Sequence, residues 1–121
     1  MKAESLKGHL DALVLATLRD EPAHGYAVIE ELKRRSGGEF ALPEGTVYPV
    51  LHRLEADGLL ESEWSTSSGR RRRIYRLTTV GEAALAAEAG QWQEFSRSMT
   101  RVLGASVAGL LRPLAASGGP A

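Results

Sequence analysis

The chain has 121 residues, of which 43% are hydrophobic and 25% charged, and its 15 basic and 15 acidic residues give a formal net charge of zero. This size and composition predict a soluble globular protein with one modest core and a terminal extension. The absence of cysteine excludes disulfides and thiolate metal sites, and the absence of a long apolar run or secretion signal predicts a cytoplasmic protein with no membrane partner.

The first third of the chain has the pattern of two amphipathic helices. Leucine and valine recur every three or four residues from Ser5 to Arg19, which predicts a helix with one apolar face. A second helix is predicted from about His24 to Arg35, and the glycines that follow Ser36 end it. Both helices are expected to pack against the same core.

The segment from Pro43 to Gly58 carries a third amphipathic pattern, around which the chain is organised. Its apolar residues predict a buried face, whereas the outer face holds Thr46, Tyr48, Pro49, His52 and Arg53. If Thr46 caps this helix, Pro49 falls in the first turn, where a missing N–H costs little. The major groove of B-DNA accepts one such helix, and the alternative is a solvated amphipathic helix.

After Gly58 the apolar period changes from 3.6 to 2, which predicts a β-hairpin. The small polar residues from Thr66 to Gly69 predict the turn, and the return strand is predicted from Arg73 to Thr78. Four consecutive arginines follow the turn: Arg70, Arg71, Arg72 and Arg73. A run of like charges is often only a solvated face, but at a hairpin bend its repulsion is relieved by an anion such as a DNA phosphate.

From about Thr79 to Leu111 the chain is predicted to be helical again, with more apolar surface than one small domain covers. Trp92, Phe95 and Met99 lie at helical spacing on this segment. Such a stripe is more often a packed interface than a ligand pocket, so we expect a second copy of the chain to cover it. Two aromatic rings that meet across a two-fold axis can also stack on a flat aromatic effector.

This order of elements predicts a mostly α fold with a small β-hairpin. We expect a winged helix-turn-helix domain in residues 1–80, a C-terminal dimerisation helix in residues 81–112 and a disordered tail in residues 113–121. His9, His24 and His52 have no metal-ligand spacing, and no glycine loop has a phosphate-binding motif, so we expect no enzyme, cofactor or metal. The zero net charge leaves open a winged-helix module that binds protein instead of DNA.

Three motifs give the chain its resemblance to a known family: H-G-Y at residues 24–26, G-T-V-Y-P-V-L-H-R-L at 45–54 and R-I-Y-R-L-T at 73–78. Together they resemble the PadR family of bacterial transcriptional regulators over about Leu6 to Leu85. The resemblance implies a homodimeric repressor that binds a palindromic DNA operator, with the central helix in the major groove and the wing, Ser65–Arg73, in the flanking groove. Some relatives sense phenolic or hydrophobic molecules between paired C-terminal helices.

The candidate sites combine these motifs with the charge pattern. The predicted DNA-binding residues are Tyr26, Thr46, Tyr48, Pro49, His52, Arg53, Ser68, Arg70, Arg71, Arg72 and Arg73. Trp92, Phe95 and Met99 are the predicted residues of the dimer interface or effector site.

Overall fold

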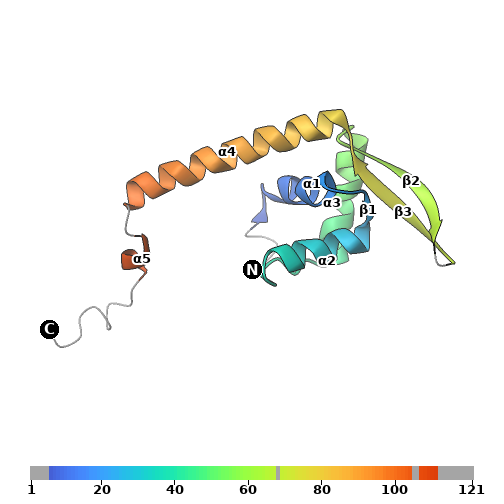
Figure 1. Cartoon of the computed structure of the whole chain (residues 1–121), viewed down its shortest axis with the longest axis horizontal. Coiled ribbons are helices and arrows are strands. Elements are labelled where there is room, and N and C mark those ends of the chain that lie inside the picture. The colour runs from blue at the N-terminus through green and yellow to red at the C-terminus, as the bar shows by residue number, and fades with distance from the viewer. Residues whose placement is uncertain (1–5, 68, 105–106, 112–121) are drawn as a thin grey trace. The chain divides into compact units, whose positions relative to one another are not determined.

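The computed structural model describes residues 6–67, 69–104 and 107–111 (Figure 1). The elements in chain order are α1 (Leu10–Arg19), β1 (Ala23–His24), α2 (Gly25–Arg35), α3 (Glu44–Ala56), β2 (Leu60–Ser67), β3 (Arg70–Leu77), α4 (Thr79–Leu103) and α5 (Val107–Leu110). The chain divides into two compact units, Met1–Glu88 and Ala89–Ala121, and α4 begins in the first and ends in the second.

One apolar core holds the first unit together. The apolar stripes of α1, α2 and α3 meet there with Leu60 and Tyr75 of the sheet. The fully buried side chains are Val14, Leu15, Val28, Val47, Leu51, Leu54, Leu60 and Tyr75. Because each helix turns every 3.6 residues, the residues predicted for the inner face of α3 are the ones that are buried.

The sheet has three antiparallel strands in the order β1-β3-β2 and not two. Ala23 and His24 pair with Tyr75 and Ile74, so the start of the H-G-Y motif is a short strand and only Gly25 and Tyr26 lie in the helix. A two-residue strand is too short to produce an alternating pattern, which explains why periodicity did not predict it.

One predicted helix start was wrong, and the cap considered for another helix is not the one observed. Helix α1 begins at Leu10 and not at Ser5, since a turn with Gly8 at φ 90° precedes it. Helix α3 begins at Glu44, because the Pro43 carbonyl already accepts hydrogen bonds from the Thr46 and Val47 amides at 3.0 and 3.2 Å. Thr46 is therefore not the cap, and Pro49 lies inside the helix beyond its first turn, where it removes one backbone hydrogen bond.

Strands β2 and β3 form the wing, which Figure 1 shows as a hairpin that extends beyond the helices. Pairing continues from Leu60 opposite Leu77 to Ser67 opposite Arg70, so β3 begins three residues before the predicted Arg73. The four arginines lie in a strand and not at a bend, and successive side chains point to opposite faces. Three helices with this wing form a winged helix-turn-helix, as predicted.

Helix α4 begins against the base of the wing. The Thr78 hydroxyl donates to the Gly58 carbonyl at 2.7 Å and accepts from the Gly81 amide at 3.0 Å, so Thr78 caps the helix. A side chain at Gly81 would lie 2.1 Å from the Leu59 carbonyl oxygen. Glycine is therefore required at this close contact.

The predicted C-terminal helix is divided into two pieces. Helix α4 ends at Leu103, where Gly104 adopts φ 93°, and α5 follows. The tail predicted for residues 113–121 lies outside the described residues. Among the described helices, none is long and apolar enough to span a bilayer.

Candidate nucleic-acid interface

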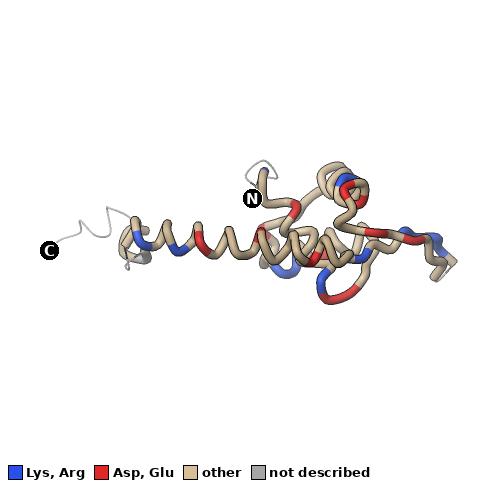
Figure 2. The backbone as a smooth tube through the Cα atoms, turned by 90° about the horizontal axis from the view of Figure 1, so that it is seen from above, with Lys and Arg blue, Asp and Glu red and all other residues tan. Residues whose placement is uncertain are grey.

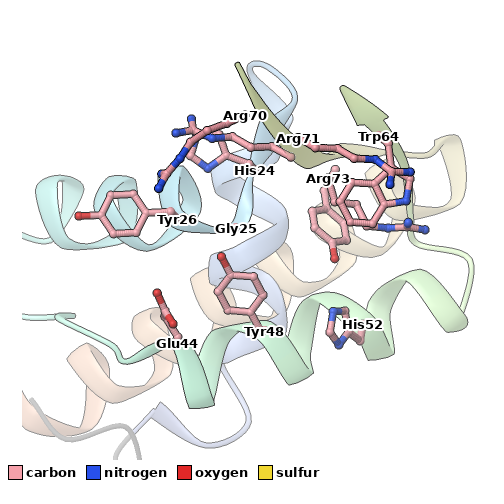
Figure 3. Close-up of a pocket in the computed structure, with 12 residues that line it drawn as sticks. His24, Gly25, Tyr26, Glu44, Tyr48, His52, Trp64, Arg70, Arg71 and Arg73 are labelled. Atoms are coloured by element: carbon pink, nitrogen blue, oxygen red, sulfur yellow. The ribbon is translucent and has the colours of Figure 1, made fainter. Parts of the chain in front are cut away.

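A hollow of about 680 Å³ lies between the N-terminus of α2, the side of α3 and the wing (Figure 3). Its lining residues are His24, Gly25, Tyr26, Glu44, Tyr48, His52, Trp64, Arg70, Arg71, Arg72, Arg73 and Tyr75. Seven of the predicted DNA-binding residues meet here: Tyr26, Tyr48, His52 and the four arginines. Figure 3 shows Tyr48 and His52 on α3, opposite Arg71 and Trp64 of the wing.

The floor of the hollow depends on a close contact between α2 and α3. A Cβ atom at Gly25 would lie 2.7 Å from the ring of Tyr48, so only glycine fits there without moving that ring. The Tyr48 ring in turn meets the His52 ring edge-on, with centroids 6.4 Å apart. Gly25 therefore determines where the Tyr48 hydroxyl is presented.

His24 links α2 to the wing. Its Nδ1 accepts a hydrogen bond from the Ala27 amide at 3.2 Å and caps α2, while its Nε2 lies 2.9 Å from Nη1 of Arg72. Burial and then the Arg72 charge lower the pKa of His24 below its usual value. No sequence pattern predicts this ring beside an arginine, because the two residues lie 48 positions apart.

The four wing arginines have different surroundings. Arg73 Nε donates to the Ser62 hydroxyl at 2.7 Å, and its Nη2 lies 3.5 Å from the Glu55 carboxylate of α3. In contrast, neither the Arg70 nor the Arg71 side chain has a hydrogen-bond or ion-pair partner among residues 6–67 and 69–104. The guanidinium of Arg71 lies 4.4 Å from the ring centroid of Trp64, as a cation–π contact.

Nearer the base of the wing, in contrast, the basic charge is compensated by acids. Arg76 Nη2 lies 2.6 Å from Glu63 Oε1, and its Nη1 lies 3.9 Å from Glu61. Uncompensated positive charge is therefore concentrated at the outer half of the wing, where Figure 2 shows basic residues gathered. This local field, and not the zero net charge of the chain, is what a polyanion at the hollow would meet.

Three predicted DNA-side residues of α3 do not line the hollow. Arg53 makes a bidentate ion pair with Asp11 of α1, at 2.5 and 3.0 Å, which raises its pKa. Arg53 comes five positions after Tyr48, so their side chains leave the helix roughly 140° apart. Pro49 is exposed and Thr46 is half-buried. Ser68 lies outside the described residues.

Apolar side chains are exposed on the part of α4 that belongs to the second unit. Trp92 and Phe95 are 57% and 56% exposed, and their ring centroids are 5.9 Å apart. Met99 lies one turn further along and is also exposed. The stripe predicted from the sequence is therefore a continuous apolar surface on this unit.

Comparison with known proteins adds independent findings. A family model described as "Transcriptional regulator PadR-like family" matches residues 14–87, more than half of the chain. Transcriptional regulator Rv3488 of Mycobacterium tuberculosis is 42% identical over 86 residues, which cover 71% of this chain and 78% of the relative.

Two solved structures extend the comparison. A PadR family transcription regulator from Clostridium difficile is 34% identical, with a TM-score of 0.71, over 80% of this chain and 100% of that one. A PadR family transcriptional regulator from Eggerthella lenta is 36% identical, with a TM-score of 0.72, over 83% of this chain and 86% of that one. The relatives named here are transcriptional regulators and not enzymes.

Proposed function

Since this chain belongs to the PadR-like family of transcriptional regulators, we propose that it represses transcription as a homodimer on a palindromic DNA operator. The observation that carries the proposal is the shared hollow. Helix α3, the start of α2 and the basic outer wing converge on one concave surface. A duplex that places α3 in its major groove brings the wing to the neighbouring phosphates.

The proposed interface divides into contacts for affinity and contacts for sequence. Arg70 and Arg71 supply uncompensated charge, which neutralises phosphates regardless of sequence. Tyr48 and His52 carry hydrogen-bonding groups along the side of α3 that borders the hollow, and Tyr26 does so at the start of α2. These three residues, with Thr46 and Pro49 in the N-terminal half of α3, are the proposed contacts to bases and nearby phosphates.

Arg53 enters the proposal with a positioning role. Its guanidinium is occupied by the Asp11 carboxylate, so the ion pair fixes α3 against α1. Sequence preference then depends on Arg53 indirectly, through the angle at which α3 enters the groove. A direct contact to a base would require this pair to open first.

We further propose that the exposed stripe of Trp92, Phe95 and Met99 is the dimer interface. Three large apolar side chains on successive turns are typical of a helix surface that a second helix covers. Paired Trp92 rings would also offer stacking surfaces to a flat aromatic effector. Quenching of Trp92 fluorescence by phenolic compounds in a Trp64→Phe background tests the effector, and the lack of any quenching or change in DNA affinity would remove it.

Selection of duplexes from a random-sequence pool by the full chain tests the function. We expect enriched sequences with dyad symmetry and half-site centres about 10 base pairs apart, since two copies of α3 related by a two-fold axis read one face of the duplex. Failure to enrich any sequence, or to shift any duplex at low salt, would contradict the proposal. That result would favour the alternative, a winged helix that binds protein.

A further inference from the structure

Trp64 is a large aromatic residue in an unusual place. It lies on β2 towards the outer half of the wing, away from the apolar core, and its side chain is 53% exposed. Exposing an indole forgoes the free energy that its burial would contribute to folding. The core therefore does not explain this side chain, and its neighbours on the wing do.

The register of the wing places two arginines beside this indole. Trp64 pairs with Arg73 and Thr66 pairs with Arg71, so all of these side chains project from one face. The guanidinium carbons of Arg71 and Arg73 lie 4.4 and 5.3 Å from the indole centroid. Figure 3 shows the indole and the guanidinium groups together above α3.

The two arginines are held differently. Arg73 is fixed from the inner side by the Ser62 hydroxyl and by Glu55 of α3. Glu55 also accepts a hydrogen bond from Ser62 at 2.5 Å, so these three residues form a connected group at the base of the wing. The Arg71 guanidinium instead contacts the Trp64 indole, and no acid among residues 6–67 and 69–104 neutralises the Arg71 charge.

From this arrangement we propose that Trp64 is a positioning residue, whose indole holds the Arg71 guanidinium ready to bind a DNA phosphate; the inference rests on the proposed DNA-binding function. A guanidinium that stacks on an aromatic ring keeps its N–H edge available for two parallel hydrogen bonds to one phosphate. Holding the side chain in place before binding lowers the entropy lost when DNA arrives. Lysine at position 71 would keep the charge but not the planar stack.

The test measures the affinity of the full chain for a dye-labelled duplex of mixed sequence at several salt concentrations. We expect Trp64→Leu and Arg71→Lys each to weaken binding about three- to tenfold at low salt, whereas Trp64→Tyr, which keeps an aromatic face, stays within about twofold of wild type. Arg71→Ala should also lower the slope of log affinity against log salt by about 1.8, because both copies in the proposed dimer lose one phosphate contact worth about 0.9.

Coupling between the two positions separates positioning from a general effect on the wing. In the Arg71→Ala background, Trp64→Leu should cause little further loss, because the group that it positions is already gone. Additive losses would overturn the inference. Wild-type affinity of the Trp64→Leu variant would also overturn it, and so would a loss of affinity in Trp64→Tyr as large as that in Trp64→Leu. If wild-type protein binds no duplex, the proposed function and this inference fail together; if only the Trp64 variants behave like wild type, the function stands and this inference fails.

Discussion

Arginines in two regions of the first unit differ in whether an acidic side chain neutralises them. On the outer half of the wing, Arg70 and Arg71 have no acidic partner in the described part of the chain, whereas on the α1 side of α3 Arg53 is held by Asp11. The difference shows that the charge an arginine leaves uncompensated depends on its pairing with residues far away in the sequence, which the local composition does not reveal.

The largest effect is expected from removing the uncompensated charge. The double substitution of Arg70→Ala with Arg71→Ala should lower affinity for every duplex by at least tenfold at low salt. It should also reduce the salt slope by about 3.6, because each copy in the proposed dimer loses two phosphate contacts and each contact accounts for about 0.9. Fluorescence anisotropy on selected and random duplexes measures both. Arg76→Ala, which removes an arginine paired with Glu63, is the matched control and should change the slope little.

The next largest loss of DNA affinity is expected from substitutions of Asp11 and Arg53, which a double-mutant cycle compares. If the pair positions α3, Asp11→Ala and Arg53→Ala should each weaken binding to a selected operator by several-fold, and the double variant should be no worse than either. The pair is partly exposed, so its contribution to the free energy of unfolding is expected to be only about 0–1 kcal/mol.

The same double-mutant cycle also tests the alternative that Arg53 contacts a DNA base directly. If Arg53 contacts a base, Asp11→Ala releases its guanidinium and removes a negative charge near DNA, so binding should tighten instead of weaken. Arg53→Ala would then relax discrimination at one operator position, while Asp11→Ala would preserve it. Thermal unfolding of each variant checks that the helices remain packed.

A smaller effect is expected at the α2–α3 contact. Gly25→Ala adds a methyl group 2.7 Å from the Tyr48 ring, which has to move, and we expect about a threefold loss of operator affinity. Gly90→Ala is the matched control, since nothing lies within 4 Å of the added Cβ. That control should leave affinity unchanged and stabilise α4 by about 0.5–1 kcal/mol. Equal behaviour of the two variants would contradict the role assigned to Gly25.

The smallest effect is a pH dependence that comes from His24. Because its pKa is lowered in the folded chain, the unfolded chain binds more protons below about pH 6.5, and this part of the stability is lost as pH falls. His24→Asn keeps a capping side chain that does not titrate. Urea unfolding between pH 7 and pH 5 should therefore show a steeper loss for wild type than for His24→Asn, and parallel curves would contradict the assignment.

Periodicity was sufficient to predict the helices and the core. Val47, Leu51 and Leu54 lie at spacings that only a helix places on one face, and the structure buries all three. The change of period after Gly58 likewise predicted the wing, because alternation is specific to strands. Local patterns of this kind are dictated by the chain itself and can be recognised without knowledge of its tertiary contacts.

The features that sequence reasoning missed depend on long-range contacts. The pair of Asp11 and Arg53 joins residues 42 positions apart, and no periodicity links them. Strand β1 exists because β3 offers it a partner. Alternation alone does not indicate what the Trp64 ring contacts. Its contact with Arg71 requires the wing register, which depends on a β3 that begins at Arg70.

The most direct test of the contrast between the two regions follows each arginine separately. Nitrogen-15 NMR spectra of the Nε–H groups, recorded while a selected operator duplex is added to the full chain, report which guanidinium groups meet DNA. We predict large shifts for Arg70 and Arg71 and small ones for Arg53 and Arg76, whose acidic partners remain in place. Large shifts at Arg53 and Arg76 with unchanged Arg70 and Arg71 would contradict the account.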